Sequence, residues 1–248
     1  LKELGLDSGY KVTVWIEAPI GSGLAGSTAL VTAVIAAVDR LFGHYRTKTQ
    51  LAETAFGIER INAEISGGWQ DQFASSFGGA NLVTYSKDGH QVIPIKLAPE
   101  TVCSLESSLF LIFTSQTHDS NEIQNSIINQ DREKIEDKLM ELKAQTTDVV
   151  SVLTQGPVKN LGPLLSESWK LKRSMSEVIS NVSLDDIYEN IISAGASGAK
   201  LLGAGGGGFF LALVQMENTH TFRVNLEGRG YKIENFRFTQ NGVQTWVE

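Results

Sequence analysis

A glycine-rich turn that leads into an apolar helix constrains this chain more than any other feature. Residues 11–17 alternate apolar and polar side chains as a strand does, and Pro19 and Gly21 end that pattern. Residues 27–42 predict a helix with almost no polar face, which would be buried on nearly all sides. The first amide groups of a helix have no partner within it, and the helix dipole is positive there. Residues 21–28 are therefore a candidate phosphate-binding turn, with a plain strand-to-helix turn as the alternative.

Two common phosphate-binding patterns fit this turn poorly. Residues 21–26 match G-x-G-x-x-G, but a dinucleotide site also needs a second strand that ends in an acidic residue about 20 positions further on. Residues 47–62 instead predict a second helix with Thr47 as its N-cap. A Walker-type loop needs a lysine directly before the Ser or Thr, and Gly26 stands before Ser27 here. An oxidoreductase would therefore rest on the glycine pattern alone.

A second glycine-rich segment covers residues 203–208. A predicted helix precedes it and a predicted strand, residues 209–214, follows it, which is the reverse of the first turn. Glycine has no Cβ, so a main chain of this kind can approach another group very closely. That group is either a neighbouring loop or a ligand, and the pattern leaves both open.

A third segment, residues 66–73, places polar side chains among glycines and aromatic residues. Asp71 within it could orient or deprotonate a substrate hydroxyl, or it could cap a turn. Glu59 lies near the end of the helix predicted before it. A carboxylate and a hydroxyl beside a phosphate turn are hard oxygen ligands, which suit Mg²⁺. The alternative for Glu59 is an exposed helix residue paired with Arg60.

The rest of the chain predicts a mixed α+β organisation with a boundary near Pro99. The second half is expected to form an antiparallel sheet with helices on one face. Predicted strand regions are 80–86 paired with 90–97, then 109–113, then 209–214, and last a hairpin of 236–240 with 243–247 around Asn241-Gly242. Predicted helices are 121–143, 158–174, 184–194 and 219–227.

Composition excludes some classes of function. The net charge of -7 argues against a basic face for nucleic acid. No stretch reaches the ~18 apolar residues that a membrane helix needs. A single cysteine, Cys103, fits a reducing compartment such as the cytoplasm, and we expect it to be a small buried residue. Residue 1 is Leu, so we expect the chain to begin inside a longer product.

Taken together, the three segments resemble the GHMP small-molecule kinase superfamily. Residues 19–28 look like its phosphate-binding motif, and residues 202–208 look like its C-terminal glycine motif. Residues 67–72 with 77–81 are similar to a sugar 1-kinase branch that holds the D-glycero-D-manno-heptose 7-phosphate kinases and the L-fucokinases. Ala25 departs from the family, which usually has Gly or Ser there.

The resemblance implies a two-lobed GHMP kinase fold. Residues 1–98 would be the N-terminal lobe and residues 99–248 the C-terminal lobe, with its antiparallel sheet and helices on one face. The N-terminal lobe would be partly missing, because the family's first motif is expected before Leu1. The oligomeric state is left open.

The resemblance also implies an activity. It implies an ATP-dependent sugar kinase that transfers the γ-phosphoryl group to the anomeric hydroxyl of D-glycero-D-manno-heptose 7-phosphate. The alternatives are an L-fucokinase or other sugar 1-kinase, and a nucleotide- or sugar-binding module without catalysis. Its partner would be a small sugar or sugar phosphate.

The same resemblance implies roles for single residues. Asp71 would take the proton of the anomeric hydroxyl, and Ser27, Thr28 and Glu59 would hold Mg²⁺. Residues that would bind the ATP phosphates are Gly21, Ser22, Gly23, Leu24, Ala25, Gly26, Ser27 and Thr28. Residues that would bind the substrate are Gly68, Gln70, Asp71, Gly205 and Gly206. Lys170 and Lys172 could bind a distal phosphate of the sugar, with exposed helix lysines as the alternative.

Overall fold

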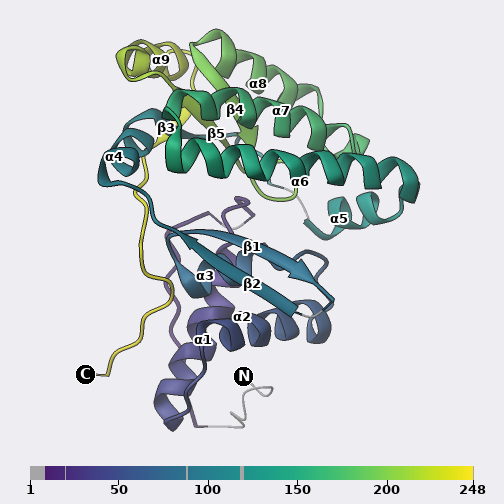
Figure 1. Cartoon of the computed structure of the whole chain (residues 1–248), viewed down its shortest axis with the longest axis vertical. Helices are drawn as coiled ribbons and strands as arrows, with labels where there is room; N and C mark the ends of the chain where they lie inside the picture. The colour runs from purple at the N-terminus through teal and green to yellow at the C-terminus, as the bar shows by residue number, and fades with distance from the viewer. Residues whose placement is uncertain (1–8, 20, 88, 118–119, 248) are drawn as a thin grey trace. The chain divides into compact units, whose positions relative to one another are not determined.

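The chain folds into two compact α+β units (Figure 1). The computed structural model describes residues 9–19, 21–87, 89–117 and 120–247. The first unit contains Ala25–Ile95, the preceding N-terminal stretch and the C-terminal stretch from Thr239. The second unit contains Gly21–Leu24 and Lys96–Phe238. The glycine turn is thus shared between them, and the assignment of residues 1–98 and 99–248 to two family lobes stays a prediction.

The described part of the first unit contains three α-helices, a π-helical turn and a hairpin. The α-helices and strands are α1 (Gly26–Phe42), α2 (Lys48–Phe56), α3 (Gln70–Phe77), β1 (Ala80–Ser86) and β2 (Gly89–Ile95). The hairpin is antiparallel as predicted, and Ala80 pairs with Ile95 at its open end. Ile35, Leu51 and Ala55 form a small core where α1 meets α2.

Helix α1 has the predicted extent but not the predicted burial. Ala33, Ala37 and Leu41 are exposed, and Leu41 has an exposed fraction of 59%. These residues are four positions apart and so lie on one side of the helix. The packed side, which includes Ile35, faces α2 and α3. The expectation of burial on nearly all sides was wrong because the neighbouring helices cover only one side.

The helix predicted over residues 47–62 is α-helical in its first part and π-helical in its last part. Thr47 caps it as predicted, because its side chain accepts from the Gln50 amide while the Gln50 side chain accepts from the Thr47 amide. After α2 the helix widens into a π-helix, η2 (Gly57–Asn62). Single π-helical turns inside α-helices are frequent at functional sites.

The strand predicted at residues 11–17 does not form. These residues are exposed and have no strand pairing in the described part of the chain. An alternating pattern becomes a strand only when a neighbouring strand accepts its hydrogen bonds.

The last predicted hairpin, at residues 236–247, does not form either. Neither Asn241 nor Gly242, both described here, has the positive φ that the expected tight turn requires. Residues 239–243 instead lie along the end of α3. The Thr239 carbonyl accepts from the Gly79 amide at 2.8 Å, and a second main-chain bond of 3.0 Å joins the Val243 amide to the Ser75 carbonyl.

A four-stranded antiparallel sheet forms the base of the second unit. Its strand order is β4 (Ala196–Leu201), β5 (Phe209–Val214), β3 (Leu109–Phe113) and β6 (Lys232–Glu234). The antiparallel sheet and strands β3 and β5 confirm the prediction. Strands β4 and β6 were not predicted, because one is rich in small residues and the other is only three residues long.

Helices of the second unit pack on this sheet, and Figure 1 shows α6, α7 and α8 side by side. The α-helices are α4 (Pro99–Ser108), α5 (Ser120–Ile128), α6 (Arg132–Gln155), α7 (Leu161–Arg173), α8 (Val182–Ser193) and α9 (Thr219–Glu227). Short 3₁₀ turns are η3 (Val158–Asn160), η4 (Glu177–Ile179) and η5 (Met216–Asn218). The single helix predicted over 121–143 is two helices, because Asp131 begins a new one by accepting from the Glu133 amide.

The main core of this unit lies between the sheet and α7, α8 and α9. Trp169, Phe210 and Phe222 are fully buried there, and the Trp169 and Phe210 rings meet edge to face at 5.6 Å. Each such side chain stabilises the fold by about 1.5–3 kcal/mol. Cys103 on α4 is exposed, so the expectation that it is buried was wrong.

Candidate active site

Two glycine segments of the second unit pack main chain against main chain. A Cβ on Gly208 would lie 2.3 Å from the Ser22 carbonyl oxygen. One on Gly203 would lie 2.7 Å from the Gly23 Cα, and one on Gly23 would lie 3.1 Å from the Leu202 carbonyl oxygen. No side chain larger than hydrogen fits this contact. Of the two alternatives for residues 203–208, a neighbouring loop or a ligand, the structure shows a neighbouring loop, Gly21–Leu24.

The two glycines predicted to bind substrate, Gly205 and Gly206, also serve packing. The Gly206 amide donates to the Ile179 carbonyl at 2.9 Å, and a Cβ on Gly205 would lie 2.9 Å from the same oxygen. Both glycines are buried. A role in substrate binding for them stays a prediction.

Helix α1 begins without a side-chain cap. Ala25, the residue before it, adopts the left-handed conformation with φ 56° and ψ 27°. The first main-chain bond of the helix runs from the Ala29 amide to the Ala25 carbonyl, so the amides of residues 26–28 precede the helical ladder. Such amides are the groups that bind phosphate oxygens at helix starts.

Glu59 is a buried carboxylate that gathers hydroxyl and amide donors. The Ser27 hydroxyl donates to its Oε1 at 2.9 Å, and the Thr28 hydroxyl lies 3.0 Å from Oε1 and 2.8 Å from Oε2. The Gln72 amide donates to Oε2 at 2.7 Å. The exposed fractions of Glu59, Thr28 and Gln72 are 2%, 3% and 0%.

This arrangement corrects the alternative in which Glu59 is an exposed partner of Arg60. Arg60 instead donates to the Ile65 carbonyl at 3.3 Å, and its guanidinium fills the space beside Gly67. The wider π-helical turn holds Glu59, which faces inward. The three residues predicted to hold a metal ion, Ser27, Thr28 and Glu59, are thus in direct contact.

The oxygen atoms around Glu59 fit a hard divalent cation. One carboxylate and two hydroxyls are present, and the buried Oε1 of Gln72 has no hydrogen-bond partner among the described residues. The described residues contain no group of three or more His, Cys, Asp and Glu side chains that could hold a metal ion. A cation here would therefore complete its shell with water or phosphate oxygens, which is how Mg²⁺ is usually bound beside nucleotides.

Asp71 lies in the first turn of α3, one residue before Gln72. Its half-buried carboxylate is close enough to Tyr85 to act on it: burial, and then the charge of Asp71, raise the pKa of the Tyr85 hydroxyl. Trp69 anchors the start of this helix by stacking on Phe56, with ring centroids 3.4 Å apart. Aromatic packing therefore holds Asp71 in place.

Among the predicted substrate residues, Gly68 and Gln70 are exposed beside Asp71, and Gly205 and Gly206 belong to the other unit. Gln72 is the contact that sequence reasoning missed. Its position directly after Asp71 was the available signal.

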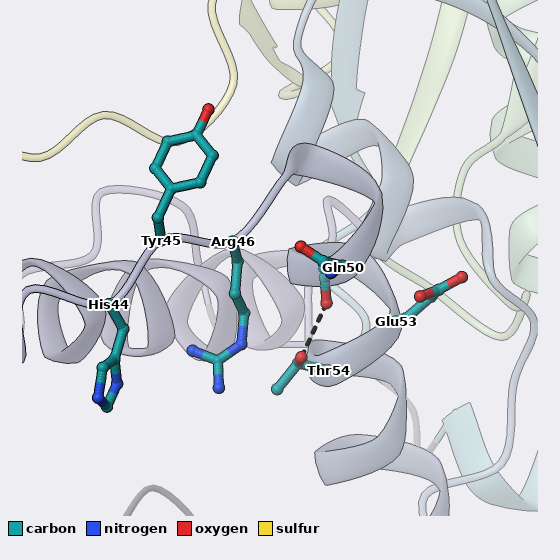
Figure 2. A pocket seen from close by; sticks show the side chains of 6 residues that line it. All are labelled: His44, Tyr45, Arg46, Gln50, Glu53 and Thr54. Atoms are coloured by element: carbon teal, nitrogen blue, oxygen red, sulfur yellow. Dashed lines mark hydrogen bonds between the residues drawn. The ribbon is translucent and has the colours of Figure 1, made fainter.

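Two cavities have walls made of other residues. One cavity, of about 660 Å³, lies at the corner between α1 and α2. Figure 2 shows the side chains that line it, among them Thr54, which donates to the Gln50 carbonyl. A second cavity of about 720 Å³ lies between α4, α9 and the chain after β6, with Cys103 and Arg223 in its wall. Neither is lined by a predicted site residue.

Family comparisons agree with the order of the motifs. The family model described as GHMP kinases N terminal domain matches residues 1–79, and the one described as GHMP kinases C terminal matches residues 149–220. Together these two matches cover more than half of the 248 residues. They confirm the resemblance drawn from the glycine motifs.

Individual relatives include sugar kinases. The chain is 29% identical over 239 residues to a protein of Campylobacter jejuni named D-glycero-alpha-D-manno-heptose 7-phosphate kinase, covering 96% of this chain and 70% of that protein. It is 28% identical to the bifunctional fucokinase/GDP-fucose pyrophosphorylase of Arabidopsis thaliana, covering 89% of this chain and 21% of that protein. A solved structure of a putative sugar kinase from Campylobacter jejuni is 30% identical, with a TM-score of 0.72.

Coverage is unequal in these pairs. The Campylobacter structure is matched over 92% of this chain and 66% of its own length, so this chain spans about two thirds of it.

Within the described residues, no helix is both long and apolar enough to span a bilayer.

Proposed function

The chain belongs to the GHMP kinase family of ATP-dependent phosphotransferases, and from this premise we propose that it phosphorylates the anomeric hydroxyl of a sugar. The preferred acceptor is D-glycero-D-manno-heptose 7-phosphate. The observation that carries the proposal is the buried Glu59 cluster, which joins the start of α1 to the helix turn that bears Asp71.

The start of α1 binds the phosphates of ATP in this proposal. The amides of residues 26–28 donate to phosphate oxygens. Ser27, Thr28 and Glu59 would hold Mg²⁺, which would neutralise part of the phosphate charge. Ser27 is exposed, so its hydroxyl can turn from Glu59 toward a ligand.

Asp71 acts on the sugar. Its carboxylate accepts a hydrogen bond from the anomeric hydroxyl and takes the proton as that oxygen attacks the γ-phosphorus. The new O–P bond forms while the bond between the γ-phosphorus and the β–γ bridging oxygen breaks, and ADP leaves. The anchored turn around Trp69 holds Asp71 in position, so much of the rate gain comes from orientation.

The choice of sugar rests on the motif around Asp71 and on the relatives. The segment Gly67–Gln72 is shared in pattern with heptose and fucose kinases, and relatives with both names match most of this chain. L-fucose is therefore the second candidate acceptor. A binding module without catalysis is the remaining alternative, and it predicts ATP binding without phosphoryl transfer.

A coupled assay of ADP release tests the proposal. Purified protein is incubated with Mg·ATP and a panel that includes heptose 7-phosphate and L-fucose, and sugar-dependent ADP with the heptose is the expected result. Asp71→Asn should lower kcat by about 10²–10⁴-fold, since it removes the base, while Asp186→Asn on the exposed side of α8 should leave kcat unchanged. Release of ADP with fucose alone would overturn the heptose assignment, and an unchanged rate in Asp71→Asn would overturn the role of Asp71.

A further inference from the structure

The two oxygens of the Glu59 carboxylate differ in what they accept. Oε2 accepts from the Gln72 amide at 2.7 Å and from the Thr28 hydroxyl at 2.8 Å. Oε1 accepts from the Ser27 hydroxyl at 2.9 Å, and the Thr28 hydroxyl lies farther from it, at 3.0 Å. A carboxylate oxygen has about two lone-pair sites, so the two donors at Oε2 leave no site there for another partner.

The donors to Oε2 are buried, whereas the main donor to Oε1 is not. Gln72 and Thr28 have exposed fractions of 0% and 3%, and Ser27 is exposed. The Ser27 hydroxyl can therefore turn to water or a ligand, while the Gln72 amide would lose its partner in a buried place. All four residues belong to the first unit. A cation that reaches this carboxylate would meet Oε1 and find Oε2 already occupied.

The orientation of the Gln72 amide carries a cost. Its own Oε1 is buried and has no hydrogen-bond partner among the described residues. Turning the amide over would place this oxygen against the Glu59 carboxylate, and two acceptors repel each other. A methionine would fill the same space without an unpaired oxygen, so packing alone does not explain an amide at this position. The bond to Glu59 does explain it.

We propose that Gln72 makes Glu59 a one-oxygen metal ligand and thereby selects Mg²⁺ over Ca²⁺. Mg²⁺ demands near-ideal octahedral geometry, which two oxygens of one carboxylate distort, whereas the larger Ca²⁺ takes roughly six to eight oxygens and accepts both. Because Gln72 and Thr28 hold Oε2, only Oε1 of Glu59 is left for the cation. Gln72 is thus a positioning residue that acts through Glu59. This inference rests on the proposed function, since it requires Mg²⁺ at Glu59 beside ATP.

Calorimetry of ATP binding tests this selectivity with Mg²⁺, with Ca²⁺ and with EDTA in place of either cation. Gln72→Met keeps the size of the side chain and removes its donor, and Gln72→Asn withdraws the amide by one methylene. Gln91→Met makes the same replacement at an exposed position on β2 of the same unit. We expect the unchanged protein and Gln91→Met to bind ATP more tightly with Mg²⁺ than with Ca²⁺.

Both Gln72 variants should lose this preference. We expect their ATP affinity with Mg²⁺ to fall by about 10- to 100-fold, which is the range when a group that orients a metal ligand is removed. Their affinity with Ca²⁺ should stay within a few fold of the unchanged protein, because the freed Oε2 can join Oε1 on the larger cation.

The outcomes separate this inference from the proposed function. If the unchanged protein binds no ATP, or binds it equally well with EDTA and with Mg²⁺, the metal role of Glu59 in the proposed function is wrong. If Mg²⁺ is required and a folded Gln72 variant keeps the preference for Mg²⁺, only the role of Gln72 is wrong. An equal loss of affinity with both cations would also overturn the inference, because it reports a structural role. So would equal affinity with Mg²⁺ and Ca²⁺ in the unchanged protein. Should Gln72→Met fail to fold, a folded Gln72→Asn decides by the same comparison.

Discussion

Replacing Glu59 by alanine should destabilise the protein more than replacing it by glutamine. Both changes remove the buried charge, so the cost of burying that charge cancels in the comparison. In Glu59→Ala the Thr28 hydroxyl and the Gln72 amide, which are 3% and 0% exposed, lose their acceptor. An unsatisfied buried donor costs about 1–3 kcal/mol, so we expect Glu59→Ala to be less stable than Glu59→Gln by about 2–6 kcal/mol.

Glutamine at position 59 can keep most of these contacts. Its carbonyl can accept from Ser27 and Thr28 as Oε1 of Glu59 does. Its amide would then face Gln72, whose Oε1 has no partner among the described residues and can accept after the Gln72 amide turns over. We therefore expect Glu59→Gln to unfold in urea within about 1 kcal/mol of the unchanged protein.

Ligand binding should not follow this order, because both variants lack the carboxylate. If Glu59 holds Mg²⁺, both variants should lose the dependence of ATP affinity on Mg²⁺, including the stable Glu59→Gln. Urea unfolding and calorimetry of ATP with and without Mg²⁺ measure the two effects separately. A stability difference below about 1 kcal/mol between the variants would refute the hydrogen-bond reasoning. Retained Mg²⁺ dependence in Glu59→Gln would refute the metal role.

Three further predictions follow from single positions. Ala25→Gly should stabilise the protein by about 0.5–1 kcal/mol in urea unfolding, since alanine is strained at φ 56° and glycine is not; a loss of stability would contradict this. Gly208→Ala should destabilise by about 2–6 kcal/mol, because the methyl would lie 2.3 Å from the Ser22 carbonyl at φ +95°, and an unchanged unfolding midpoint would show that reasoning to be wrong. Burial and then Asp71 raise the pKa of Tyr85, so its contribution to stability is present below its ordinary pKa of 10.0 and is lost as pH rises through the higher folded value. Asp71→Asn should lower the pKa of Tyr85 in an absorbance titration referenced to Tyr85→Phe, and an identical titration would contradict the assigned cause.

Elements whose hydrogen-bond partners are close in sequence could be predicted from the sequence. Thr47 and the residues after it carry a capping box, and the helix begins there. The pairing of β1 with β2 followed from alternation on both sides of a short turn. Residues 11–17 and the Asn241-Gly242 turn have equally clear local patterns, yet neither forms a strand pair. In both cases a strand would form only if another main chain paired with it. A local sequence pattern does not reveal whether such a partner is present.

The site was predictable in part for the same reason. The glycine turn, Ser27 and Thr28 are adjacent in sequence, and the family resemblance added Glu59 and Asp71. The contact between Gln72 and Glu59 depends on how α3 packs on the π-helical turn, which no spacing rule describes. The strained conformation of Ala25 was equally invisible, although its departure from the family pattern marked the position.

The donors around Glu59 are all neutral groups, two hydroxyls and an amide. In a structural ion pair an arginine or lysine would take their place. An arginine or lysine beside a buried carboxylate would cancel its charge within the protein, and the pair would then attract no further cation. Hydroxyls and an amide satisfy the lone pairs of Glu59 while leaving its negative charge in place, and no ion pair to it is present in the described part of the chain. A buried charge of this kind is costly unless a cation joins it. In the proposed function, the same residues that stabilise Glu59 would therefore leave a site that gains energy when Mg²⁺ and phosphate bind together.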